Sequence, residues 1–318
     1  MWRALLAVVL LAAIAAGGAL TARHVYRMSG PLPEARNVVV PRGGAERIAQ
    51  TLHDADVIAW EPTFRLALLA TMRSGSLHAA ELAFPAHASL REVLAILRTA
   101  HQVEHRLTIP EGLTAQQIDT LLAHAEAMTG SVTPAEEGAI LPDTYSYAYG
   151  TPREALLARA EAAQAKALDA AWAARTPDPG LASPRDAVIL ASIVERETAK
   201  PEERAQIAAV FLNRLRLGMR LQADSTVVYA ASGGLGVLDH PLTRAELEQD
   251  SPYNTYRNYG LPPGPICAPG IASLHAVLHP AATDNLYFVA DGTGGHVFAR
   301  TLAQHETNVK RWRNLETR

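Results

Sequence analysis

LASIVERET, at residues 190–198, combines a helical apolar pattern with two glutamates two positions apart. At about 100° per residue, three aliphatic side chains of this stretch fall within about 60° of Glu197, whereas Glu195 points nearly the opposite way. Burial disfavours the charged form of a carboxyl group and raises its pKa toward neutrality, as a general acid requires. The pattern predicts a helix that carries one desolvated carboxylate, Glu197. A structural ion pair at the helix end is the alternative.

Signals on both sides of this stretch indicate where the helix begins and which faces it has. Ser183 suits the N-cap, Pro184 suits the first turn, and an aspartate follows three residues after the cap. Ser192 and Arg196 fall on a different face from Glu197. We therefore expect an amphipathic helix with its apolar stripe toward the core.

Composition limits the class of protein. The chain has 318 residues, 48% of them apolar, which is enough for two domains with sizeable cores. The net charge of −3 gives no indication of a nucleic-acid partner, which normally shows as a basic excess. Cys267 is the only cysteine, so no intrachain disulfide forms, and we expect it to be a small packing residue.

The N-terminus carries one long apolar run. From Ala4 to Ala22 only Thr21 is polar, which gives about 19 residues, close to the minimum for crossing a bilayer. The apolar region of a cleaved signal peptide is usually shorter, so an uncleaved anchor is favoured and a signal peptide is the alternative. Arginines lie on both sides of the run and leave its orientation open. A short stub inside and the rest outside is the simpler topology.

A strand–proline–helix pattern occurs three times after a linker at residues 29–37. The copies begin at Asn37, Glu81 and Arg106. The first two predict a small βα module between about residues 36 and 105, and the third begins the next domain. Further along, the sequence predicts an Ala-rich helix at 151–175, a helix from Pro201 to Leu215, a strand at 285–290 and a return strand at 296–298.

Glycosidase-like chemistry is the first candidate function, with Glu197 as proton donor. It needs a polar groove, because amides and phenols suit sugar hydroxyl and N-acetyl groups. The candidate groove residues are Gln222, Asp224, Thr226, Tyr229, Asn254 and Tyr256. Hydrolysis usually needs a second carboxylate, for which Asp224 is the obvious candidate.

Other chemistries find weaker support. His275 and His279 have i, i+4 spacing but lack the glutamate of a metalloprotease motif, so packing or capping is expected. Ser192 does not stand in a nucleophile elbow. Gly292 to Gly295 precede a strand rather than a helix, which excludes a phosphate loop. No metal and no cofactor are expected.

An ordered set of motifs resembles the endolytic murein transglycosylases, the MltG or YceG-like family. The motifs span most of residues 36–315. They are TIPEG at 108–112, LPDTY at 141–145, ASIVERET at 191–198, AVFLNRL at 209–215, GMRLQADSTVVY at 218–229, YNTY at 253–256, GLPPGPI at 260–266, HPA at 279–281 and LYFVADG at 286–292.

The resemblance implies an α+β architecture in three parts. These are a cytoplasmic stub and transmembrane anchor at 1–28, a linker and LysM-like module at 29–105, and a YceG-like mixed α/β catalytic domain at 106–318 with a lysozyme-like active-site helix. It implies a single-pass protein of the cell inner membrane with its bulk in the periplasm. Its expected partners are peptidoglycan glycan strands and, near them, peptidoglycan synthases.

The resemblance also implies the reaction. The family cleaves the bond between N-acetylmuramic acid and N-acetylglucosamine within nascent strands without water, leaving 1,6-anhydro ends. Its catalytic glutamate precedes a threonine and maps to Glu197, which acts first as acid and then as base. Asp224 then becomes a structural or groove residue, and Asn254 is expected to hold an N-acetyl group. A muramidase-type hydrolase and a peptidoglycan-binding membrane scaffold are the alternatives.

The chain departs from the family at three places. Ser225 stands where many members have proline, Ala139-Ile140 replace aromatic residues after Glu137-Gly138, and residues 78–81 lack the usual Gly-x-Tyr. These departures concern glycan-binding details and leave the Glu197 motif itself intact.

Overall fold

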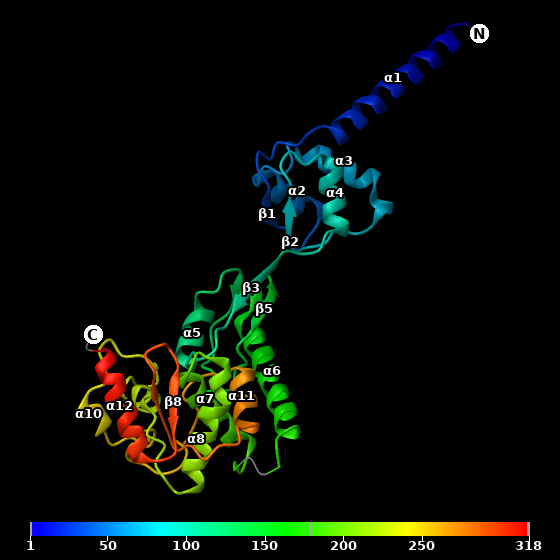
Figure 1. The fold of residues 1–318 in the computed structure, drawn as a ribbon. Coiled ribbons are helices and arrows are strands. Elements are labelled where there is room, and N and C mark those ends of the chain that lie inside the picture. Colours follow the sequence, from blue (N-terminus) through cyan, green and yellow to red (C-terminus); the bar gives the residue numbers. More distant parts are fainter. Residues whose placement is uncertain (1, 178–179, 317–318) are drawn as a thin grey trace. The chain divides into compact units, whose positions relative to one another are not determined.

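The structure, a computed structural model, describes residues 2–177 and 180–316 (Figure 1). Contacts divide the chain into two compact units. The first comprises residues 1–105 with 147–150, and the second comprises 106–146 with 151–318. Helices and short strands alternate in both units, which confirms the mixed α/β character.

The first unit begins with α1 (Trp2–Arg27), which the apolar run forms. The segment Leu5–Arg27 is long and apolar enough to cross a membrane, and none of it is buried inside the protein. A helix is the expected form for such a segment, because it satisfies its own backbone hydrogen bonds in lipid.

The rest of the first unit is a small α/β module. Strands β1 (Arg36–Val39) and β2 (Glu81–Phe84) pair antiparallel. The helical elements are α2 (Ala45–Asp54), α3 (Glu61–Ala70), η1 (Met72–Ser74) and α4 (Leu90–Thr99). Their fully buried core includes Phe64, Phe84 and Leu94. The two predicted strand–helix repeats form, and α3 is an additional helix between them that the repeat pattern does not contain.

The second unit is built mainly of helices. Its helical elements are α5 (Ala115–Ala123), α6 (Arg153–Ala173), α7 (Pro184–Glu197), η2 (Pro201–Glu203), α8 (Arg204–Arg216), α9 (Asp224–Ala231), α10 (Arg244–Leu247), α11 (Ile271–Leu278) and α12 (Leu302–Glu316). Its own strands are β4 (Met128–Thr129), β6 (Thr151–Pro152), β7 (Tyr287–Ala290) and β8 (His296–Ala299), whereas β3 (Glu104–Thr108) and β5 (Thr144–Ala148) each contain residues of both units. β3 pairs with β5, β4 runs parallel to β6, and β7–β8 form an antiparallel hairpin.

α7 begins as the sequence predicts. Ser183 is the N-cap, its Oγ accepts from the Asp186 amide at 3.2 Å, and Asp186 accepts from the Ser183 amide at 3.1 Å. Pro184 occupies the first turn, where its missing N–H removes no helical hydrogen bond. This capping box fixes the start of α7 and therefore the rotation at which Glu197, its last residue, leaves the helix.

α7 is buried along its middle. Residues 187–194 are all buried, because α7 packs against α6, α8, α9 and α11. Ser192, which the helical pattern places on a different face from Glu197, is fully buried. Its Oγ donates to the Ile189 carbonyl at 2.7 Å and accepts from the Ile266 amide at 3.0 Å. Both hydrogen bonds of this hydroxyl are satisfied inside the protein, so Ser192 is a core residue, whereas Arg185 and Arg196 stay exposed.

Candidate active site

Glu197 lies at the point where α7 ends and meets the beginning of α9. The Ser225 hydroxyl, in the first turn of α9, donates to Glu197 Oε1 at 2.7 Å. Burial raises the pKa of Glu197 to about 7; the Ser225 hydrogen bond opposes that rise, and the charge of Asp224 adds to it. The residue keeps some exposed surface. A carboxyl group in this setting exchanges protons near neutral pH and remains open to a ligand.

Asp224 and Tyr256 complete the polar group around Glu197. The Tyr256 hydroxyl donates to the Asp224 carboxylate. Burial, the hydrogen bond to Asp224 and the charges of Asp224 and Glu197 raise the pKa of Tyr256, so it stays a neutral donor. We call Glu197, Ser225, Asp224 and Tyr256 the Glu197 cluster. The pKa of Glu197, raised to about 7, makes it the candidate for proton transfer in this cluster.

Gln222 is exposed and lies beside this cluster in sequence. Its backbone is left-handed, with φ of 51°. Its backbone N–H donates to the Thr255 carbonyl at 3.2 Å, and its side-chain Oε1 accepts from Arg214 at 3.3 Å. A side chain that is exposed and held at one atom is suited to the wall of a groove. The role of Gln222 in glycan binding stays a prediction.

Thr226 and Asn254, which the sequence predicts to contact a sugar, are both fully buried, and their contact with glycan stays a prediction. Thr226 Oγ1 donates to the Ala223 carbonyl at 2.7 Å and lies 2.9 Å from the Thr255 hydroxyl. The Asn254 amide group donates to two backbone carbonyls, at 3.1 and 2.8 Å, and its oxygen accepts from the Tyr256 amide at 2.9 Å. Both side chains hold the turn that presents Tyr256.

Tyr229 contacts a second buried carboxyl group, Glu137. The Tyr229 hydroxyl donates to Glu137 Oε2 at 3.1 Å, and the Ala115 amide donates to Glu137 Oε1 at 3.0 Å. Burial raises the pKa of Glu137 to about 7. Sequence reasoning gave Glu137 no role, although the Glu137-Gly138 pair was part of the family pattern. Ser225 and Tyr229, four residues apart on one face of α9, each bind one carboxyl group with a raised pKa.

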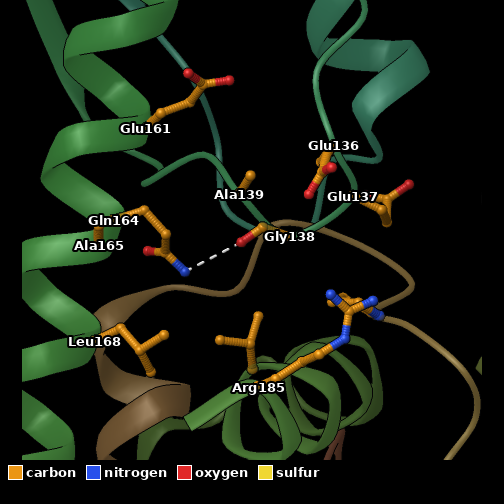
Figure 2. A pocket seen from close by; sticks show the side chains of 11 residues that line it. Glu136, Glu137, Gly138, Ala139, Glu161, Gln164, Ala165, Leu168 and Arg185 are labelled. Atoms are coloured by element: carbon orange, nitrogen blue, oxygen red, sulfur yellow. Dashed lines mark hydrogen bonds between the residues drawn. The ribbon is translucent and has the colours of Figure 1, made fainter.

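Glu137 also lines a pocket of about 490 Å³ that does not include Glu197. Figure 2 shows Glu136 and Glu137 on one wall, Gln164 of α6 opposite, and Arg185 below. Gln164 donates to the Gly138 carbonyl at 3.2 Å. The pocket and the Glu197 cluster are therefore separate features of the second unit.

Glu195 points to a different part of the second unit, as the helical geometry predicts. Its side chain is 5% exposed and pairs with Arg204 at 3.2 Å. The amide of Gly270, the N-cap of α11, donates to its second oxygen at 2.9 Å. A carboxylate is favoured at a helix N-terminus and beside an arginine. These contacts make Glu195 a structural residue.

The histidines take packing and pairing roles. His275 and His279 stack with ring centroids 4.3 Å apart. Within residues 2–177 and 180–316, no three His, Cys, Asp or Glu side chains gather as a metal site would require. His296 Nδ1 lies 2.7 Å from Glu203 and joins the β7–β8 hairpin to η2. Burial of Glu203 is outweighed by its hydrogen bonds from His296, so the pKa of Glu203 is lowered.

Comparison with known proteins gives one consistent family. Residues 38–311 match the YceG-like family. An endolytic murein transglycosylase of Bacillus subtilis (strain 168) is 48% identical over 116 residues, 36% of this chain and 31% of that protein. One from Streptococcus pneumoniae serotype 2 is 37% identical over 179 residues, 54% of this chain and 31% of that protein. The matched stretches thus span about a third of these relatives' length.

A solved structure agrees. The crystal structure of a putative YceG-like protein from Listeria monocytogenes superposes with a TM-score of 0.54 at 28% identity, covering 86% of this chain and 98% of that one.

Proposed function

Because the chain belongs to the YceG-like family, we propose that it is an endolytic murein transglycosylase. Its substrate is the glycan strand of peptidoglycan, and it cleaves between N-acetylmuramic acid and N-acetylglucosamine. The product carries a 1,6-anhydro end. Two relatives with this name share 37% and 48% identity with parts of the chain.

The pKa and position of Glu197 carry the proposal. Protonated Glu197 donates to the oxygen that leaves the anomeric carbon, and the glycosidic bond breaks. The resulting carboxylate then takes the proton of the muramyl 6-hydroxyl while that oxygen bonds to the anomeric carbon. The donated proton stays on the leaving oxygen, Glu197 is protonated again by the 6-hydroxyl proton, and water is not consumed. A single carboxyl group that is protonated in part near pH 7 is suited to both steps.

The remaining members of the Glu197 cluster support this assignment. Ser225 donates to the same carboxyl group and holds its orientation. Asp224 is already bound by the Tyr256 hydroxyl, which favours a role in shaping the site over one as an independent nucleophile. Gln222, Tyr229 and Tyr256 remain the proposed glycan-contacting residues.

We also propose that α1 anchors the protein in the cell inner membrane and that residues 29–318 lie in the periplasm. The module of residues 29–105 is then a LysM-like glycan-binding element. Residues 106–318 form the catalytic domain, with α7 as its lysozyme-like active-site helix. Cleavage near peptidoglycan synthases would end strand elongation.

Mass spectrometry of digested sacculi tests the reaction. The wild-type chain is expected to release fragments with 1,6-anhydromuramyl ends. Glu197→Gln is expected to release none while its unfolding transition stays cooperative. Glu202→Gln is the matched control, because Glu202 is exposed and five residues from Glu197. Reducing ends alone would identify a muramidase-type hydrolase. Full cellular function of Glu197→Gln would identify a glycan-binding scaffold.

A further inference from the structure

The helix α3 presents large apolar side chains to solvent. Leu66 and Leu69 on α3 are 67% and 66% exposed. Trp60, the N-cap, and Met72, just after the helix, are 66% and 67% exposed. Four exposed large apolar side chains within 13 residues are a feature that marks an interaction site, and three of them, Leu66, Leu69 and Met72, line one hollow. We call Trp60, Leu66, Leu69 and Met72 the α3 surface.

A groove joins the α3 surface to α1. It has a volume of about 1070 Å³ and is lined by Gly18, Thr21 and Ala22 of α1 and by Leu66 and Ala70 of α3. The N-terminus of α4 closes it with Leu90. On its other side α3 borders a second hollow of about 700 Å³, which Leu66, Leu69 and Met72 line. Leu66 lines both hollows and so connects the apolar side chains on the two sides of α3.

The position of this groove along α1 indicates how deep in the bilayer the groove lies. Gly18, Thr21 and Ala22 are the last residues of the apolar run from Ala4 to Ala22. In a membrane-spanning α1 they lie in the hydrocarbon of one leaflet and its boundary, because four residues of helix cover only about 6 Å. Leu66 and Ala70 line the same groove, so they lie at nearly the same depth.

The charges beside the groove suit phospholipid headgroups. Arg23, Arg27 and Arg91 line it just beyond the apolar residues. Arginines next to a membrane span attract anionic headgroups, and tryptophan is enriched at the membrane interface. Apolar surface followed by arginine is the order in which a bilayer presents hydrocarbon and headgroups.

We propose that the α3 surface inserts into the bilayer interface beside the anchor, with anionic phospholipid filling the groove between α1 and α3. The proposal rests on α1 spanning the membrane, as proposed above. The module is then attached to the membrane by a helix and by its own surface. It cannot rotate freely about the end of α1.

Site-directed spin labelling of the full chain tests this in nanodiscs of phosphatidylglycerol and phosphatidylcholine. Cys267 is fully buried, so an introduced exposed cysteine is labelled selectively. Leu69→Cys reports the α3 surface, and Ala13→Cys reports whether α1 is in the bilayer. Thr99→Cys is the control, because it is exposed at the far end of α4, about 14 Å along the helix from Leu90.

The ratio of collision rates with oxygen and with a water-soluble nickel chelate gives the depth of each label. We expect a ratio several-fold higher at Leu69→Cys than at Thr99→Cys, and a fall at Leu69→Cys in nanodiscs without phosphatidylglycerol. Equal ratios at positions 69 and 99, with Ala13→Cys deep, would overturn the proposal. So would spin–spin broadening at position 69, which would identify a second copy as the occupant.

A label at position 13 that behaves as aqueous would remove both the anchor and this proposal. The digest of sacculi is independent of these labels. Failure of the membrane contact and failure of the proposed reaction are therefore distinguishable.

Discussion

Replacing Ser225 by alanine removes the hydroxyl that donates to Glu197 Oε1. The bond is 2.7 Å long and joins a neutral donor to a carboxyl oxygen. It favours the ionised form of Glu197, so it opposes the rise that burial causes in the Glu197 pKa. Its removal must raise that pKa further, because the burial remains and the compensating donor is lost.

The expected shift follows from the strength of such a bond. A hydrogen bond to a charged group contributes about 1.5–3 kcal/mol, and solvent replaces part of it at a partly exposed residue. One pKa unit corresponds to about 1.4 kcal/mol. We therefore expect the pKa of Glu197 to rise by about one unit in Ser225→Ala. If protonated Glu197 is the acid, activity falls as pH increases through this pKa, and the alkaline limb moves to higher pH.

The assay is the pH dependence of kcat/KM for glycan cleavage, measured as the rate of formation of anhydromuramyl ends. Ser225→Thr keeps a hydroxyl and should restore the wild-type limb. Ser232→Ala is the matched control, because Ser232 caps the end of the same helix and its hydroxyl bonds to the Tyr229 carbonyl and the Gly236 amide, away from Glu197. An alkaline limb that stays in place in Ser225→Ala, or that moves equally in Ser232→Ala, would refute the reasoning.

Three further substitutions test the roles of buried groups. The raised pKa of Glu197 stabilises the wild-type fold below pH 4.5, and this contribution of up to about 3 kcal/mol is lost as pH rises through 7. Glu197→Gln lacks this dependence, so its free energy of unfolding should increase relative to wild type between pH 4 and pH 8. Urea unfolding at the two pH values measures the change. Glu195→Ala leaves Arg204 without its nearer partner and should lower the free energy of unfolding by about 3 kcal/mol, whereas a loss below about 1 kcal/mol would contradict a structural role. Gly138 has a φ of 75°, and a Cβ added there would lie 2.7 Å from Pro265. Gly138→Ala should therefore lower the melting temperature, and a melting temperature equal to wild type would contradict this close approach.

Local signals in the sequence were enough to predict where α7 begins and which of its glutamates point in different directions. The capping box at Ser183 and the spacing of aliphatic residues are read within one helical turn, so the start of α7 and the separation of Glu195 from Glu197 were predictable. The N-terminal helix was predictable for the same reason. The burial of Ser192 was not, because it depends on which helices pack against α7.

Polar contacts between distant segments could not be predicted. Ser225 meets Glu197 across 28 residues and Tyr229 meets Glu137 across 92. Thr226 and Asn254 were assigned to a sugar because their side chains suit one, yet their hydrogen bonds go to nearby backbone and side-chain groups of the chain itself. The residue type determines which groups a side chain can bind. Only the folded structure shows whether its hydrogen-bonding atoms already have partners within the protein.

The spacing on α9 links two proton-binding groups that are far apart in sequence. Ser225 and Tyr229 stand one turn apart on a single short helix, and each hydroxyl holds a different carboxyl group. Inserting or deleting one residue between them would turn one hydroxyl by about 100° away from its partner. A tilt of α9 as a rigid rod changes the length of both hydrogen bonds at once. The surroundings of Glu137 and of Glu197 are therefore linked through one short helix, although no atom of one carboxyl group need approach the other.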